Sequence, residues 1–155
     1  MNTQQIAATA VNEQQFRDAV MPRAQLSKLA SEIAIEKTTQ QNVKQFAEWE
    51  LMEATTVIDV LKDLGTPVSP VNKDSENFLA KLKELDEKEF NKEYMEAELS
   101  NHEFLRDLAQ NYINGVDEKL SSNEGEIWHV ANLALFAFTE HIGLSKKIKN
   151  ELNAN

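Results

Sequence analysis

The sequence predicts an all-α fold in one domain, built as a bundle of four long helices. Only four of its 155 residues are glycine and three are proline, so few residues interrupt helices. Glu, Ala, Leu and Lys are four of the five most frequent residues, and these residues have high helix propensity. Apolar residues recur at three- and four-residue steps over long stretches, as they do in amphipathic helices. A chain of this length can bury one sizeable core, and no second domain is expected.

The first long helix is predicted over residues 13–38 and the second over residues 39–64. Pro22 predicts a kink in the first helix, or its division into two shorter helices, because proline lacks a backbone donor. Thr39 is expected to cap the second helix, and Gly65 is expected to end it. The second helix carries the apolar residues Val43, Phe46, Ala47, Leu51, Val57, Leu61 and Leu64, and its inward stripe is expected to be set by Val43, Phe46, Val57, Leu61 and Leu64.

One clear loop follows the second helix, over residues 66–74, and contains Pro67 and Pro70. It leads into a short amphipathic helix that is predicted to run from Ser75 to about Leu85.

The third long helix is predicted over residues 86–113, with Gly115 just past its end. The fourth is expected to begin at Asn123, where Glu126 stands three residues later as in a capping box. It is expected to carry an apolar stripe of Ile127, Ala131, Ala134, Leu135, Phe138, Ile142 and Ile148.

The lengths of the connections predict the topology. Short connections after the first and third helices indicate two antiparallel hairpins, whereas the long link between helices two and three can cross the length of the bundle. This is a ferritin-like four-helix bundle with a short extra helix in the crossover. Residues 1–12 are expected to be a flexible N-terminus, and residues 13–151 the single bundle domain.

An internal similarity relates the second and third helices. A shift of 48 residues places Phe46, Glu48, Glu50, Leu51 and Val57 on Tyr94, Glu96, Glu98, Leu99 and Leu105. If the crossover makes the two helices run the same way, Glu50 and Glu98 lie at one height, about ten residues or ~15 Å into each helix. Such a short match also arises by chance between two amphipathic helices.

Five polar side chains are predicted to form one layer inside the bundle: Glu50, Glu53, Glu98, His102 and His141. The two carboxylates of helix two fall on its apolar stripe, Glu98 and His102 share a face, and His141 is in phase with the stripe of helix four. A buried, unpaired carboxylate costs several kcal/mol, so a cation, a metal or a proton should accompany these groups. Carboxylate and imidazole ligands on facing helices suit a divalent ion of iron, manganese or zinc.

A polar layer without metal explains the same pattern, because both histidines could simply bond to glutamates at the edge of the core. A complete two-metal centre is not expected. The only Glu-x-x-His sequence, Glu126 to His129, lies in the first turn of the fourth helix. In the first helix, Glu36 is far from the height of the layer and Glu32 lies off the stripe.

Composition also narrows the choice of partners. The chain has 26 acidic and 16 basic residues and a net charge of -10, so nucleic acid is not an expected partner. There is no cysteine, which excludes disulfides and thiolate-bound zinc. No transmembrane segment is expected. Residues 1–11 show no signal peptide, which predicts a cytoplasmic protein as the chain is written, or a periplasmic one whose leader has been removed.

Several segments, spread over about residues 15–150, resemble one known family. They are Leu29-Ala30, Val43-Lys44-Gln45-Phe46-Ala47, Leu64-Gly65 with Pro67, Glu89-Phe90 to Tyr94, His102 and His141. In their order and spacing the chain is similar to the bacterial ferritin-like domain of unknown function numbered 4142.

The resemblance implies a ferritin-like bundle, often exported to the periplasm, with no established activity. It also implies an Asp-His pair in helix two and one histidine in each of helices three and four. This chain is similar at His102 and His141, but Glu53-Ala54 stands where the Asp-His pair would be. Glu50 or Glu53 could replace the missing ligand with an oxygen donor.

Together these observations predict a metal-binding protein with a role in metal or stress handling. No catalytic residue is identified, and an enzymatic activity is not favoured. The alternative is a metal-free helical module that serves a structural role or contacts a protein partner or a second copy of the chain.

Overall fold

A computed structural model of the protein describes residues 12–116 and 122–154, with the side chains of residues 122–124 excepted. Within these residues the chain forms five α-helices and no strand, which confirms the all-α class. The helices are α2 (Glu13–Lys37), α3 (Gln41–Asp63), α4 (Lys73–Glu84), α5 (Glu87–Asn114) and α6 (Ser122–Ala154). The predicted flexible segment, residues 1–12, lies outside the described part except for Asn12.

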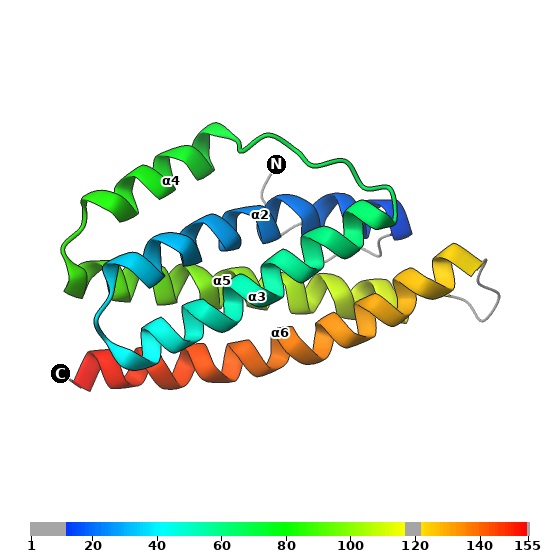
Figure 1. Ribbon diagram of the computed structural model, residues 1–155. Coiled ribbons are helices and arrows are strands. Elements are labelled where there is room, and N and C mark those ends of the chain that lie inside the picture. Colours follow the sequence, from blue (N-terminus) through cyan, green and yellow to red (C-terminus); the bar gives the residue numbers. More distant parts are fainter. Residues whose placement is uncertain (1–11, 117–121, 155) are drawn as a thin grey trace.

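The four long helices lie side by side, and Figure 1 shows their directions. Helices α3 and α5 run the same way, and α2 and α6 run the opposite way. The chain returns between α3 and α5 through a loop and α4, which lies outside the long helices (Figure 1). Helix α2 packs on α3 and α5, and α6 packs mainly on α5. Helices α3 and α6 also contact each other, but less extensively than any of these three pairs. The expected parallel course of the second and third long helices is therefore confirmed.

Helix α2 continues through Pro22 from Glu13 to Lys37, so of the two expected alternatives, a kink or a division into two helices, the division is wrong. The backbone carbonyl that loses its donor belongs to residue 18, and Asp18 is exposed, so water can take the place of the missing hydrogen bond. At the N-terminus, Asn12 and Gln15 form a reciprocal capping box.

The N-cap of α3 is Gln40, whereas the sequence had predicted Thr39. The Gln40 side chain accepts a hydrogen bond from the backbone N–H of Val43 at 2.8 Å. Thr39 instead donates its backbone N–H and its hydroxyl to Oε1 of Glu87 at the start of α5. Thr39 therefore contacts α5 and does not cap α3. At the other end of α3, Gly65 adopts a φ of 87°, which confirms it as the residue that ends the helix.

The remaining boundaries are close to those predicted. Helix α4 begins two residues earlier than expected, because Asn72 caps it by accepting from the N–H of Ser75. Asp86 caps α5, and Gly115 follows its last residue. Helix α6 begins at Ser122 and extends to Ala154, three residues past the predicted end of the domain. The side chain of Asn123, the predicted cap, lies outside the described residues.

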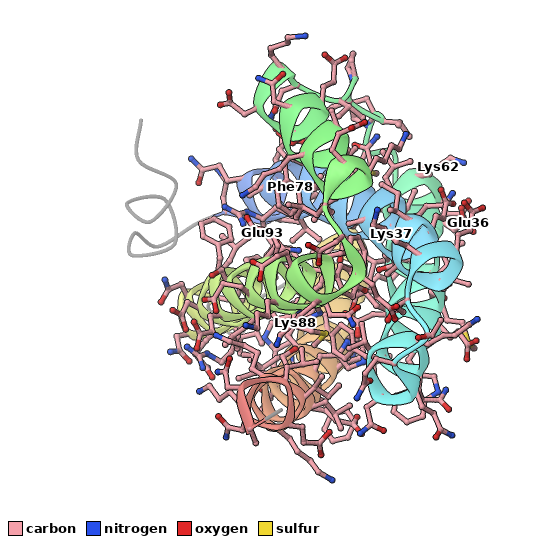
Figure 2. The ribbon with its side chains drawn as sticks, turned by 90° about the vertical axis from the view of Figure 1, so that its left-hand side faces the viewer. Glu36, Lys37, Lys62, Phe78, Lys88 and Glu93 are labelled. Carbon is pink, nitrogen blue, oxygen red and sulfur yellow. The ribbon has the colours of Figure 1, made fainter. Side chains whose placement is uncertain are left out.

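Two apolar clusters form the core. The first contains Phe16, Val20, Met21, Leu61, Leu105, Leu108, Ala109, Tyr112, Ile127, Ala131 and Phe138. The second contains Ala30, Ala34, Val43, Phe46, Ala47, Leu82, Phe90, Tyr94, Met95 and Ile148. Helix α4 covers the second cluster with Leu82 and Phe78, and Figure 2 shows it outside the long helices in an end view. None of the described helices is long and apolar enough to cross a membrane.

Candidate metal centre

Three helices bring two carboxylates and two imidazoles together between the apolar clusters. Helix α3 supplies Glu50 and Glu53, α5 supplies His102, and α6 supplies His141. One oxygen or nitrogen atom from each of the four side chains lies within 4.8 Å of the others. His102 is 0% exposed, Glu50 2% and His141 8%, while Glu53 is partly exposed. The group is therefore buried and reaches solvent mainly at Glu53.

The atoms that face one another are Oε2 of Glu50, both carboxylate oxygens of Glu53, Nε2 of His102 and Nδ1 of His141. Glu50 Oε2 lies 3.0 Å from His102 Nε2 and 2.8 Å from His141 Nδ1. Glu53 Oε2 lies 2.9 Å from His141 Nδ1, and Glu53 Oε1 lies 3.6 Å from His102 Nε2. The two imidazole nitrogens are 3.3 Å apart. All four side chains thus direct a potential ligand atom into one small volume.

A backbone hydrogen bond fixes the orientation of the His102 ring. Its Nδ1–H donates to the carbonyl oxygen of Glu98, one turn earlier in α5, at 2.8 Å. The other ring nitrogen, Nε2, is consequently turned toward Glu50 and Glu53. Histidines that bind metals are commonly held in this way, with the second ring nitrogen donating to a carbonyl or a carboxylate.

Ser27 of α2 links the group to a third carboxylate. Its Oγ lies 2.7 Å from Oε1 of Glu50 and 2.6 Å from Oε2 of Glu98. A hydroxyl carries one proton, so Ser27 can donate to only one of these oxygens. The other contact is a hydrogen bond when Glu98 is protonated and donates to Ser27 Oγ. The two contacts therefore call for a proton on one of the two carboxyl groups. Glu98 is the one placed to carry it, because the other oxygen of Glu50 faces the two histidine nitrogens.

The electrostatic surroundings of the two glutamates agree with this assignment. Burial raises the pKa of Glu98, the negative charge of Glu50 raises it further, and the result is a pKa of about 8. Burial also tends to raise the pKa of Glu50, but the charges of His102 and His141 and their hydrogen bonds outweigh it and lower the pKa to about 2. At neutral pH, Glu98 is thus the acid and Glu50 the carboxylate.

Both histidines hold protons strongly when no metal is present. Burial tends to lower the pKa of His141, but the hydrogen bonds that its ring donates to Glu50 and Glu53 raise the pKa to about 9. Burial likewise opposes the charge of His102, yet the charge of Glu50 and hydrogen bonds to both glutamates raise its pKa well above 6.5. In the metal-free state the two imidazolium ions therefore balance the two carboxylates.

Two phenylalanine rings enclose the polar group along the bundle axis. Phe46 of the second apolar cluster lies with its ring centroid 5.3 Å from that of His141 and 6.3 Å from that of His102. Phe138 of the first cluster lies 5.8 Å from the His102 ring, edge on. Because apolar rings offer no hydrogen bonds, the charged groups depend on one another, on Ser27, on solvent at Glu53 or on a bound ion.

Comparison with known protein families gives one match. Residues 1–126 match the family described as Domain of unknown function (DUF4142). The chain belongs to this family. No curated protein and no solved structure matches it. The part of the chain that matches DUF4142 contains Glu50, Glu53 and His102 and ends before His141.

Of the five residues predicted as metal ligands in this DUF4142 protein, the structure brings four into one group, and Glu98 lies outside it. Oε2 of Glu98 is turned toward Ser27 and lies 3.7 Å from Nδ1 of His102, the nitrogen that faces away from the group. Glu98 therefore lies on the Nδ1 side of the His102 ring and does not face the donor atoms of the group.

The residues that sequence reasoning had set aside lie apart from the group. Glu32 and Glu36 are exposed on α2, and Figure 2 shows Glu36 at the outside of the bundle. Glu126 and His129 are exposed on α6. Within the described residues, a single cluster of this kind is present.

Sequence reasoning missed Ser27, because the first helix was searched for carboxylates. The available signal was a pair of serines on an otherwise small and apolar stripe, Ala24, Ser27, Ala30, Ser31 and Ala34, all of which are buried. Ser31 bonds the hydroxyl of Tyr94 at 2.8 Å. Small hydroxyl residues facing the interior of a bundle indicate buried polar partners on another helix.

Proposed function

We propose that this protein is a ferritin-like four-helix bundle that binds one divalent ion of iron, manganese or zinc through Glu50, Glu53, His102 and His141. The observation that carries the proposal is the spacing of the four ligand groups: one ligand atom from each lies within 4.8 Å of the others, and the carboxylate–imidazole and imidazole–imidazole pairs lie 2.8 to 3.6 Å apart. Donor atoms bound to one ion at about 2.0–2.1 Å lie roughly 3.3 Å apart in a tetrahedral shell and roughly 3 Å apart in an octahedral one.

Charge supports the same proposal. Two carboxylates neutralise a divalent ion, and two neutral imidazoles complete a donor set that suits iron, manganese and zinc. Binding would displace one proton from Nε2 of His102 and one from Nδ1 of His141. The hydrogen bond from His102 to the Glu98 carbonyl already leaves Nε2 as the nitrogen directed at the ion. A bound ion would thus replace two buried protons without leaving a charge unbalanced.

The parallel course of α3 and α5, with a crossover between them, supports the ferritin-like topology, because that arrangement distinguishes such bundles from simple up-and-down ones. We infer a role in holding or buffering the ion, as part of metal or stress handling. A two-metal catalytic centre is not favoured, because the four protein donors form one group and no second group accompanies it in the described part of the chain.

The proposal is tested by elemental mass spectrometry on untagged protein purified without chelators, before and after reconstitution with iron, manganese and zinc. We expect close to one ion per chain. The double variant His102→Ala/His141→Ala should lose it while keeping its helicity in circular dichroism. His129→Ala is the matched control, since it removes the third histidine of the chain, which is exposed and outside the group. Unchanged metal content in the double variant would show that the ion binds elsewhere.

A metal-free interaction module is the second candidate, and exposed apolar residues on two helices favour it. Leu133 and Phe136 of α6 are 72% and 67% exposed, and Met52 and Trp49 of α3 are exposed as well. Large apolar side chains gathered on one face often mark a contact surface. No bound metal after reconstitution, together with self-association that Phe136→Ala abolishes, would favour this function.

A further inference from the structure

Arg23 of α2 has no carboxylate partner among the described residues. The chain has three arginines, and all three are described. Arg17 bonds both oxygens of Glu13, through Nε at 2.6 Å and through Nη2 at 3.2 Å. Arg106 uses the same two nitrogens for the carboxylate of the residue that follows it. Arg23 makes one hydrogen bond, from Nη1 to Oδ1 of Asn101 at 3.0 Å. Within the described part of the chain, its Nε–H and Nη2–H groups therefore have no acceptor.

Arg17 shows what this edge of a guanidinium group can hold. Nε–H and Nη2–H lie side by side, and the two oxygens of a carboxylate match them. Arg17 and Arg23 both lie on α2, and in both of them Nη1 donates to a side-chain oxygen of another element. Glu13 stands one turn before Arg17. The corresponding position, one turn before Arg23, is Ala19. Helix α2 thus supplies a carboxylate to Arg17 and none to Arg23.

Arg23 lines a pocket of 490 Å³ between α2, α5 and the start of α4. Ala19 lines it from α2, Phe104 from α5 and Phe78 from α4. Phe104 covers one face of the guanidinium group, because the centroid of its ring lies 3.5 Å from Cζ of Arg23. Burial lowers the pKa of Arg23 to about 10. The charge of Arg23 is therefore partly removed from water without a counter-ion to offset the cost.

The other residues of the pocket favour a monoanion with an apolar body. Leu26 and the rings of Phe78 and Phe104 offer apolar contacts. Asp18 and Asp74 also line the pocket, and both are exposed. Because Coulomb repulsion grows with charge, these two carboxylates oppose a dianion such as phosphate more strongly than a monoanion.

We propose that this pocket binds a small monocarboxylate with an apolar body. Its two oxygens accept hydrogen bonds from Nε–H and Nη2–H of Arg23, and its body packs against Phe78 and Phe104. The ligand supplies to Arg23 the counter-charge that Glu13 supplies to Arg17. The inference is independent of the metal proposal, because none of the four donor residues lines this pocket.

The test follows the Nε–H NMR signals of the three arginines in the isotope-labelled full chain. Metal is removed with a chelator beforehand, so that no ion can bind a carboxylate. Hexanoate is compared with 1-hexanol, which has a similar body without the charge, and with inorganic phosphate, which has charge without the body. We expect hexanoate to bind with a Kd of about 1 mM or lower and to shift the signal of Arg23. The other two compounds should bind about 10-fold or more weakly. The signals of Arg17 and Arg106, whose Nε–H groups already have acceptors, should not move.

Arg23→Met keeps an apolar stem and removes the guanidinium group, so we expect hexanoate binding to weaken about 10-fold or more. Arg106→Met is the matched control, because it removes the same charge from a residue that does not line the pocket. In both variants, binding is measured from the ring signals of Phe78 and Phe104.

Ala19→Glu places a carboxylate one turn before Arg23, as Glu13 stands before Arg17. It should occupy the open edge and weaken hexanoate binding by a similar factor. Gln14→Glu adds the same charge at an exposed position of α2 and should leave binding unchanged. Ala19→Glu also keeps the test available if circular dichroism shows that Arg23→Met does not fold.

Hexanol or phosphate binding as tightly as hexanoate would overturn the proposal. So would hexanoate binding that is unchanged in folded Arg23→Met or Ala19→Glu protein, or hexanoate that leaves the Arg23 signal in place at about ten times the expected Kd.

Discussion

The apolar clusters at the two ends of the bundle and the polar layer between them use the same helices but depend on different physical rules. In the clusters, side chains such as Leu108 and Phe90 are held by shape and burial, and each contact is weak and replaceable. In the layer, Glu50 has hydrogen-bond partners on α2, α5 and α6, and each partner is needed to offset the cost of burying its charge. Equally buried residues of the clusters and of the layer therefore differ in their tolerance of substitution.

Within the layer, the buried residues Glu50 and Glu98 also differ, in their electrostatic surroundings. They are 48 residues apart in matching positions on parallel helices, and Ser27 touches both. The prediction that they share one height is therefore confirmed, and Phe46 and Tyr94, also 48 residues apart, contact edge to face. Their pKa values nevertheless move in opposite directions. The histidine nitrogens face Glu50 and lower its pKa, whereas burial and the negative charge of Glu50 raise the pKa of Glu98.

The largest effect is expected for Glu50→Ala, which leaves two imidazolium groups with half of their counter-charge. We expect the free energy of unfolding of the metal-free protein to fall by about 3–5 kcal/mol and metal binding to be lost. Urea unfolding with chelator, together with metal analysis, measures both. Glu48→Ala, at an exposed position on the same helix, is the control. A loss no larger than that of Glu48→Ala would remove the distinction between layer and surface.

Leu108→Ala should act on the first cluster alone. Leu108 is fully buried, and loss of its side chain should lower the free energy of unfolding by about 2–4 kcal/mol. Metal content should not change, because the substitution leaves the four donors in place. Loss of metal in a folded Leu108→Ala protein would show that the cluster and the layer are tightly coupled, and would contradict the expectation that the substitution acts on the cluster alone.

Ser27→Ala should have a smaller effect on stability and a separate effect on metal affinity. It leaves Glu50 and Glu98 without their shared hydroxyl, and we expect a loss of about 1–3 kcal/mol. Because Ser27 orients Glu50, metal affinity should fall by about 10- to 100-fold. Ser31→Ala, which removes a bond to Tyr94 one turn away, should destabilise without changing metal affinity. Equal metal affinities in the two variants would argue against a role of Ser27 in positioning Glu50.

The smallest effect concerns pH. The pKa of His141 is about 9 in the folded metal-free protein and near its ordinary value of 6.5 when unfolded. A raised pKa gives stability that is full below pH 6.5 and is lost as pH rises through about 9. We expect the melting temperature with chelator to fall by a few degrees over this range, and less so in His141→Ala.

Metal affinity should change in the opposite sense, because protons compete with the ion and leave the histidines as pH rises. Titration with Zn²⁺ across the same pH range checks this. An affinity that does not depend on pH would contradict the assignment of both imidazoles as ligands.

The helices and their inward faces follow from local patterns in the sequence. Apolar spacing, caps such as Asp86 and the stop at Gly65 are local properties, so the five helices and the inward phase of Glu50, His102 and His141 could be predicted. The lengths of the connections also indicated the parallel crossover, since only a long link can span the bundle.

Tertiary structure decided which atoms meet. The choice of Gln40 over Thr39 as a cap depended on Glu87 from another helix, and the bridging role of Ser27 and the proton on Glu98 depended on three helices at once. The physical reason is that a helical position turns by about 100° per residue, so sequence fixes the face of a side chain. Whether that side chain finds a carboxylate, a hydroxyl or an imidazole depends on how neighbouring helices are rotated and shifted along their axes, and only packing of the whole bundle sets these.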